Sequence, residues 1–383
     1  MRRLSSRTGR GDWLRDLPFE TVVFRRCVAL HRNLDRAVFP ERQSPEGRET
    51  AKGVALRALR AGAAARRLKV EEIPGSYEEL RRPAPARDGT LAPDPFEGLP
   101  LPRDPEALAR ASFADVGRGA ALAVFNAEDH LSLYATSDAP YAKQWRELDA
   151  ILAEASHEAP FAYDASWGYL AANPDHAGTG LALSLDVGLF GLFLAHTLDP
   201  ALRALDRLGF ETVPTFGPFP ADESGLDAPG CRYTVRSIRN AGSERDIVGR
   251  MDATARELAR QEQNARLKLL GARSPALSDF VARSVAAGAF ARQLPQAEAL
   301  DVALAILFAD DLGLLPLGSR LRAGFADLAR ALSIPEDAPA GAEARPPRPD
   351  ADPKPAAEAA AARRADLLHP FCRPLLGLLD KLP

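Results

Sequence analysis

The chain has 383 residues, of which 46% are hydrophobic and 26% are charged, and its formal net charge is -3 at pH 7. This length is enough for roughly two domains of about 150 residues each. The 49 Lys and Arg nearly balance the 52 Asp and Glu, which argues against a nucleic-acid binder that works by blanket neutralisation of phosphates. No apolar stretch approaches the roughly 20 residues that a membrane span needs. We therefore expect neither a nucleic-acid nor a membrane partner.

Strand-like runs and helical patterns alternate in the first two thirds of the chain. The strand-like runs lie at residues 121–125, 130–134, 168–172, 181–187 and 210–216. Helical periodicity at residues 141–155 and 198–208 separates some of these runs. This order predicts a mixed sheet with helices.

From residue 243 onward the pattern becomes helical. Apolar residues three and four apart predict helices at 246–270, 278–292 and 296–310, and Gly271 is placed as the C-terminal stop of the first. Stretches rich in Pro and Gly interrupt the pattern at 83–105, interpreted as a surface crossing, and at 335–355, interpreted as a linker.

The cysteines Cys27, Cys231 and Cys372 are odd in number and widely spaced. This spacing fits neither a disulfide framework nor a zinc finger and is typical of a reducing compartment. The start of the chain has basic residues but no apolar segment after them, so we expect no secretory signal and a cytoplasmic protein. No metal site is predicted.

Two polar loops carry most of the candidate chemistry. Asn126, Glu128, Asp129 and His130 lie between two strand-like runs, where a hairpin tip can present a carboxylate and an imidazole for acid-base chemistry or metal binding. Hairpin turns also favour Asn and Asp because these side chains bond the local backbone. The residues alone leave both interpretations open.

The second loop, residues 173–180 (NPDHAGTG), contains amides that can hold an anion, but its glycines are too few for a phosphate-binding loop or a dinucleotide fingerprint. A tight connection between strands explains them equally well. His31 and His196 sit among apolar residues, and we interpret them as packed histidines rather than ligands.

In this order, the two loops resemble the guanidino-phosphotransferase family, specifically its bacterial protein-arginine kinase branch. Residues 126–131 (NAEDHL) are similar to N-E-E-D-H-L, and 168–184 (GYLAANPDHAGTGLALS) to G-Y-L-T-A-C-P-T-N-x-G-T-G-L-R-A-S. Residues 22–34 (VVFRRCVALHRNL) are similar to V-V-x-S-T-R-I-R-L-A-R-N-L. Residues 243–269 and 277–315 resemble the long helix and the helical C-terminal domain of the arginine kinases.

This resemblance implies an α+β fold. A guanidino-kinase-like domain with an antiparallel β-sheet flanked by helices is expected at residues 15–260, followed by an all-α C-terminal domain at 261–383. Enzymes of the family bind Mg-ATP through several arginines, and carboxylates and a cysteine hold the guanidinium. Since phosphoryl transfer depends on positioning and on neutralising phosphate charge, loss of the arginines is expected to be severe.

The chain departs from the family pattern at the residues that carry this chemistry. The positions of phosphate-binding arginines hold Cys27, Ala29, Ser132, Ala182 and Pro214. The first Glu of the hairpin motif is Ala127, and Asn173 replaces the cysteine. Glu223 is a loose candidate for the second carboxylate, and an R-D-x-x-R-A element implicated in phosphoarginine recognition keeps only Arg364 and Ala365.

The candidate catalytic residues are therefore Glu128, Asp129 and His130 of the retained motif, together with Asn173. Arg25 and Arg26 are candidate cofactor-binding residues. A strand alternates faces, so Arg26 is expected to point away from Cys27, while Arg25 shares its face at a different depth.

The leading hypothesis is a pseudokinase that acts as a regulatory or scaffolding module. The alternative is an active but divergent protein-arginine kinase that rebuilds its site from Arg25, Arg26 or Arg36 with Glu128. The cofactor is Mg-ATP if the chain is active and otherwise none. Expected partners are other proteins, among them an active kinase paralogue or protein quality-control components. A third hypothesis is that the fold is kept mainly for oligomerisation through its helical domain, with an active paralogue as the partner. A homodimer through the C-terminal domain is a further expected partner state.

Overall fold

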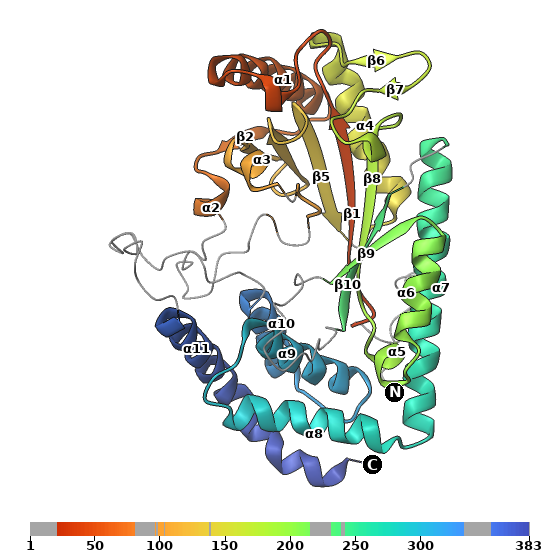
Figure 1. The fold of residues 1–383 in the computed structure, drawn as a ribbon, viewed down its shortest axis with the longest axis vertical. Coiled ribbons are helices and arrows are strands. Elements are labelled where there is room, and N and C mark those ends of the chain that lie inside the picture. Colours follow the sequence, from red (N-terminus) through yellow and green to blue (C-terminus); the bar gives the residue numbers. More distant parts are fainter. Residues whose placement is uncertain are drawn as a thin grey trace.

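The computed structural model describes residues 21–80, 96, 99–102, 104–137, 139–214, 231–238, 242–332 and 354–382. Within them, a central antiparallel sheet has the order β2-β3-β4-β5-β1-β8-β10-β9 (Figure 1). Its strands are β1 (Val23–Arg32), β2 (Val70–Ile73), β3 (Ser112–Val116), β4 (Ala121–Phe125), β5 (Leu131–Ser137), β8 (Leu181–Gly188), β9 (Phe210–Pro214) and β10 (Arg232–Ser237). A separate hairpin pairs β6 (Tyr163–Asp164) with β7 (Gly168–Tyr169).

Helices cover one face of the sheet and continue below it (Figure 1). The α-helices are α1 (Pro45–Ala65), α2 (Tyr77–Leu80), α3 (Pro105–Ala109), α4 (Tyr141–Glu158), α5 (Phe190–Leu194), α6 (Leu198–Arg207), α7 (Glu244–Gly271), α8 (Pro275–Phe290), α9 (Gln296–Asp311), α10 (Ser319–Leu332) and α11 (Lys354–Cys372). Short 3-10 helices are η2 (Pro40–Arg42), η3 (Pro174–His176) and η4 (Arg373–Lys381). The predicted α+β class, an antiparallel sheet followed by a helical C-terminal region, is confirmed.

Side chains of strand β1 alternate between the two faces of the sheet. It pairs with β5 on one side and β8 on the other, so it is buried almost throughout. Val28 and Leu30 belong to the main core, in which α1 and α4 pack against each other and α4 against β1. Cys27 and Ala29 point to the opposite face, into a smaller apolar cluster with Phe113. The cavity described below lies on this second face.

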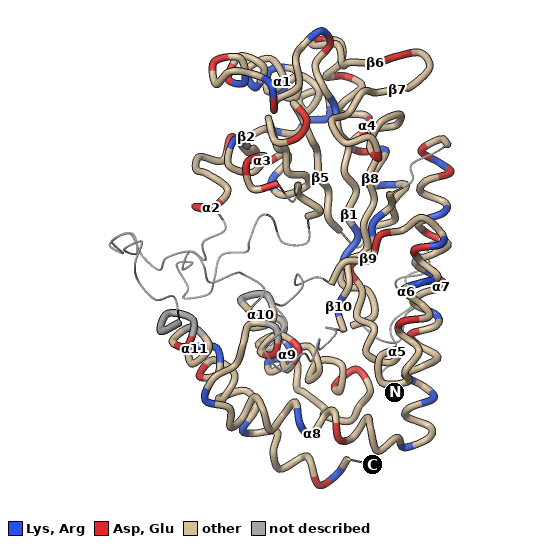
Figure 2. The backbone as a smooth tube through the Cα atoms, in the orientation of Figure 1, with Lys and Arg blue, Asp and Glu red and all other residues tan. Residues whose placement is uncertain are grey.

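The helical part begins with α7, which is 28 residues long. Ser243 and Asp246 form a capping box at its start, which supplies partners for the first unpaired amides of the helix. Basic and acidic residues alternate along α7 (Figure 2), so its exposed arginines are part of a mixed surface rather than a concentrated basic patch, while Arg266 is buried. Among the described residues, no helix is both long and apolar enough to cross a membrane.

The sheet and the C-terminal helices share one hydrophobic cluster. Phe190 of α5 stacks on Phe308 of α9 with ring centroids 5.0 Å apart, and Leu304 and Val28 belong to the same cluster. The predicted boundary at residue 260 falls within α7, and the division into two domains stays a prediction. Most of the predicted linker, residues 335–353, lies outside the described residues, and α11 begins at Lys354.

Most of the predicted elements correspond to observed ones, with one clear exception. The run 168–172 was predicted as a strand, but only Gly168–Tyr169 pairs, as β7. The rest of that run continues into the loop that carries Asn173, because the chain must turn back there to reach β8. In the predicted surface crossing, Phe96 is buried and Leu99 and Leu101 pack against the second apolar cluster.

Candidate functional site

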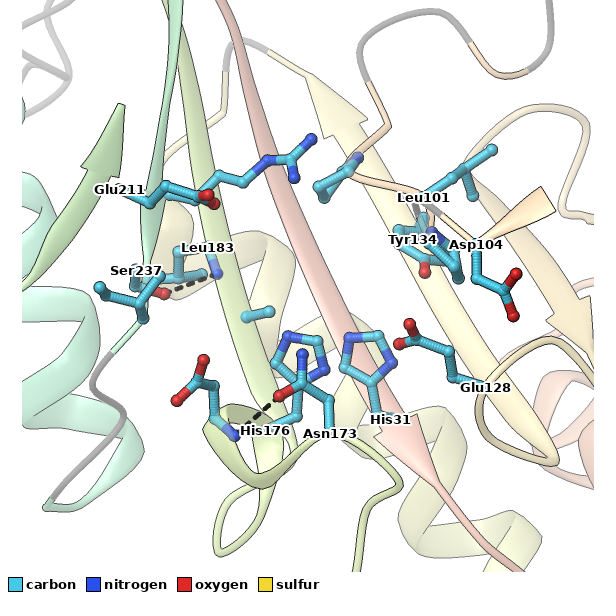
Figure 3. Close-up of a pocket in the computed structure, with 16 residues that line it drawn as sticks. His31, Leu101, Asp104, Glu128, Tyr134, Asn173, His176, Leu183, Glu211 and Ser237 are labelled. Carbon is cyan, nitrogen blue, oxygen red and sulfur yellow. Dashed lines mark hydrogen bonds between the residues drawn. The ribbon is translucent and has the colours of Figure 1, made fainter. Parts of the chain in front are cut away.

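A cavity of about 440 Å³ lies on the face of the sheet opposite α4 (Figure 3). Side chains of β1, β5, β8 and β10 and the two polar loops contribute to its walls. The lining residues are His31, Pro100, Leu101, Pro102, Asp104, Glu128, Tyr134, Asn173, Asp175, His176, Ala182, Leu183, Glu211, Arg236, Ser237 and Ile238. Figure 3 shows the rings of His31 and His176 side by side, with Glu128 and Tyr134 to one side and Glu211 and Ser237 to the other. The two polar loops predicted from the sequence therefore meet at one cavity.

The turn between β4 and β5 brings Glu128 to the cavity. Asn126 has a φ of 56°, a left-handed conformation that Asn tolerates better than most residues, and its amide donates to the Arg48 carbonyl oxygen at 2.7 Å. Burial, together with the nearby Asp129 and Asp104 carboxylates, raises the pKa of Glu128. Glu128 is thus a cavity-facing carboxyl group whose charged form is disfavoured by its surroundings.

Asp129 and His130 are part of a buried network centred on Asn33. The side-chain amide nitrogen of Asn33, Nδ2, donates to Asp129 Oδ1 at 2.6 Å, and Asn33 Oδ1 accepts from the His130 backbone N–H at 3.0 Å. The Ala172 amide also donates to Asp129 Oδ1, at 2.8 Å. Burial raises the pKa of Asp129. These contacts tie the end of β1 to both polar loops, and neither Asp129 nor His130 lines the cavity.

His31 and His176 were not predicted to form a site, but the fold brings them together. Their rings stack with centroids 4.1 Å apart and an interplanar angle of 6°. Burial, reinforced by the Arg32 charge, lowers the pKa of His31 to about 3, and burial beside His31 lowers the pKa of His176 to about 3. Both imidazoles are therefore neutral at pH 7. Alternation along β1 was the available signal, since it places His31 on the face of Ala29 and Cys27.

Asn173 lines the cavity at the position where the family pattern has a cysteine. Its Oδ1 accepts from the Asp175 backbone amide at 2.9 Å, which caps η3. This contact gives Asn173 a structural role, because its side chain caps the turn that begins η3. It also fixes the loop that presents His176.

The predicted cofactor-binding arginines do not line the cavity. Arg26 is fully buried and its guanidinium lies 5.6 Å from the Tyr141 ring of α4, on the face opposite Cys27, as strand alternation predicts. Arg25 is half-buried and Arg36 projects into solvent beside Asp35. Among the described residues that line the cavity, the one arginine is Arg236 of β10, which sequence reasoning missed.

Three of the positions where the family pattern has phosphate-binding arginines, Cys27, Ala29 and Ala182, belong to the smaller apolar cluster on this face of the sheet. Ala29 lies opposite Ala182 in the pairing of β1 with β8, and Cys27 lies opposite Ser184. Burial raises the pKa of Cys27 to about 12, so its thiol is not a ready nucleophile. Ser132 is buried and its hydroxyl contacts His31 Nδ1 at 2.9 Å.

The charge of the cavity does not fit a triphosphate. Its described lining includes four carboxylates, from Asp104, Glu128, Asp175 and Glu211. The single guanidinium, from Arg236, lies on the strand position paired with Glu211. Because a triphosphate is held by several charge-assisted bonds from cationic groups, the described lining of this cavity is a poor fit for Mg-ATP. Glu223, the loose candidate for a second carboxylate, lies outside the described residues.

The segment that resembles part of a phosphoarginine-recognition element, with Arg364 and Ala365, lies in α11. Arg364 donates to the Leu294 carbonyl oxygen at 3.2 Å, and the Leu294 amide donates to the Ala361 carbonyl oxygen at 3.0 Å. Ala365 is fully buried. These contacts give Arg364 a structural role in joining α11 to the segment between α8 and α9.

Comparisons with known proteins agree with the resemblance seen in the loops. Residues 116–265 match the sequence model of the family described as ATP:guanido phosphotransferase, C-terminal catalytic domain. A protein-arginine kinase of Exiguobacterium sp. is 30% identical over 197 residues, which are 50% of this chain and 54% of that protein. A protein-arginine kinase of Halothermothrix orenii is 26% identical over 311 residues, which are 78% of this chain and 81% of that protein.

The match to the Exiguobacterium protein thus spans about half of its length. A solved lombricine kinase structure covers 64% of this chain and 67% of its own, with 17% identity and a TM-score of 0.44. Over residues 116–265 the chain resembles the ATP:guanido phosphotransferase family, and the relatives that it matches are bacterial protein-arginine kinases.

Proposed function

We propose that this chain is a pseudokinase of the protein-arginine kinase branch, which keeps the fold as a regulatory or scaffolding module and does not transfer phosphate. The observation that carries the proposal is the cavity lining, with four carboxylates and one guanidinium among the described residues. Carboxylates near a triphosphate repel it, and positioned cationic groups are the main contribution of a phosphoryl-transfer enzyme. The substitutions at Cys27, Ala29 and Ala182 support the same conclusion, since they place an apolar surface where the family has arginines.

The alternative, an active divergent kinase with Mg-ATP as cofactor, requires several guanidinium groups to converge beside Glu128. Arg25, Arg26 and Arg36 do not line the cavity, and Arg236 is the one arginine among its described lining. Glu128 itself lies where a carboxylate could receive a guanidinium. We favour the pseudokinase because phosphoryl transfer depends more on cationic groups that neutralise the phosphates than on the one carboxylate that is retained.

As a module, the chain would act by binding other proteins, and an active kinase paralogue, protein quality-control components or a second copy of the chain are the partners we propose. The β6–β7 hairpin supports protein binding, because Tyr163 and Trp167 are exposed there by 62% and 74%. Exposed aromatic rings of this kind are enriched at protein interfaces. Location in the cytoplasm remains part of this proposal.

Incubation of the chain with Mg-ATP and an arginine-containing protein substrate is expected to give no phosphoarginine, since the triphosphate lacks its cationic partners. The product is measured by mass spectrometry under conditions that preserve the acid-labile phosphorus–nitrogen bond. A Glu128→Gln variant is assayed in parallel as a control for contaminating kinase. Phosphoarginine that forms with the parent chain and disappears with Glu128→Gln would overturn the proposal.

A further inference from the structure

Three side chains with metal-binding atoms converge beside the cavity, and two of them, His31 and His176, line it. His31 comes from β1, Asp129 from the β4–β5 turn and His176 from η3, and one ligand atom of each lies within 4.8 Å of the others. We propose that His31, Asp129 and His176 form a site for a divalent transition-metal ion of the Zn²⁺ class, with an open coordination position toward the cavity. The proposal goes beyond the pseudokinase assignment and does not depend on nucleotide binding.

Two polar atoms of the cluster have no hydrogen-bond partner within the described part of the protein. Asp129 is fully buried, and its Oδ2 has no hydrogen-bond partner. His176 Nδ1 is likewise buried and without a hydrogen-bond partner. Buried polar atoms are nearly always paired, so two unpaired atoms at one place indicate a missing ligand. A cation bound to both would satisfy them at once.

Neighbouring polar groups hold these ligands in a fixed orientation. The Asn33 and Ala172 amides hold Asp129 Oδ1 at 2.6 and 2.8 Å, which leaves Oδ2 directed at His31, 3.5 Å from its Nδ1. The Ser132 hydroxyl lies 2.9 Å from the same nitrogen and can rotate to release it. Partners that fix the orientation of a ligand in this way strengthen metal binding.

The donor set selects the class of ion. Two imidazoles and one carboxylate match the nitrogen and oxygen ligands of Zn²⁺, and three protein ligands leave the fourth tetrahedral position open. Mg²⁺ prefers six oxygen ligands, so this cluster disfavours it. Zn–N bonds of about 2.0–2.1 Å require the ligand atoms to come closer together than they lie here. His176 can supply that movement, because it is half-buried on a three-residue turn.

The charge of the cavity also favours a cation. Glu128 and Asp175 lie among its lining residues together with His31 and His176. Carboxylates lining one concave surface raise the local concentration of cations. The same feature that argues against a triphosphate therefore supports a metal ion.

The test uses the full chain without an affinity tag, freed of metal with a chelator and titrated with ZnCl₂ alone in a calorimeter. We expect one Zn²⁺ per chain, with affinity at least tenfold lower in His176→Gln and in His31→Gln. His157→Gln, which changes an exposed histidine in the last turn of α4, is the matched control and is expected to bind like the parent. Circular dichroism of each variant checks that it is folded.

Absence of saturable Zn²⁺ binding by the parent chain would overturn the proposal without any variant. It would also be overturned if His176→Gln and His31→Gln both bound Zn²⁺ like the parent, or if equimolar Mg²⁺ displaced Zn²⁺. None of these titrations contains nucleotide. A failure here therefore leaves the phosphotransfer experiment unaffected, and a phosphoarginine signal leaves the metal titration unaffected.

Discussion

Replacement of Arg266 by methionine is expected to lower the free energy of unfolding by about 3–5 kcal/mol, because it leaves a buried carboxylate without its cation. Arg266 and Glu262 are both fully buried, and their side chains meet at 2.6 Å. Arg266 also donates to Thr21 Oγ1 at 2.8 Å, and Glu262 accepts from the amides of Gly191 and Leu192. This network joins the start of β1, the segment after β8 and α7, so its loss is expected to loosen the sheet from the helical part.

The measurement is chemical unfolding of the parent and the variant, followed by circular dichroism. Arg260→Met is a matched control, since Arg260 forms a bridge of the same 2.6 Å length with Glu257 on the same helix. That bridge is exposed, so its loss is expected to change stability by at most about 1 kcal/mol. An Arg266→Met variant no less stable than Arg260→Met would contradict the role assigned to the network.

Gly168→Ala is expected to cost about 2–5 kcal/mol of unfolding free energy, from the sum of backbone strain and overpacking. Gly168 has a φ of 77°, and a methyl group there would press on the Gly178 backbone, with its Cα at 2.7 Å and its carbonyl oxygen closer still. Backbone atoms cannot rotate away as a side chain can. The β7 end of the second polar loop, which carries Asn173 and His176, would have to move.

Gly119→Ala separates the two contributions. Gly119 has a similar φ of 87°, but a methyl group there meets nothing within 4 Å. Only the strain of a left-handed residue remains, about 1–2 kcal/mol. Thermal unfolding of both variants makes the comparison. Equal losses of stability would show that the contact between Gly168 and Gly178 adds nothing.

Local patterns allowed much of the fold to be predicted. The run 121–125 corresponds to β4, and the helix predicted at 246–270 corresponds to α7. Gly271, predicted as the stop, is instead the last residue of that helix, and Ala272 is its C-cap. The order of the two polar loops along the chain was also enough to recognise the resemblance to the family. In these cases the signal lies within one element or one motif.

Contacts between segments that are far apart in the sequence could not be predicted from local patterns. His31 and His176 are far apart in the sequence, and they meet only because β1 pairs with β8 and the loop before β8 folds over the sheet. His31 was therefore interpreted as a packed residue. Arg236 was missed because nothing near β10 in the sequence indicates which neighbours the strand will have.

Asp129 and His130 illustrate a different limit. Their motif is retained, but their side chains form hydrogen bonds with Asn33 and do not line the cavity, whereas Glu128 of the same motif does. A short motif gives residue types and spacing. Which way each side chain points depends on the turn conformation, here set by Asn126 in a left-handed conformation.

Titration of Mg-ATP against the purified chain tests the pseudokinase account most directly, with the melting temperature as the readout. A ligand that binds only the folded state at 100 times its dissociation constant adds about 2.7 kcal/mol of stability, which a melting curve resolves easily. Mg²⁺ alone and Mg-ADP serve as controls that separate metal from nucleotide binding. We predict a melting temperature that does not respond to Mg-ATP. A saturable rise with Mg-ATP that Mg²⁺ alone does not produce would contradict the account.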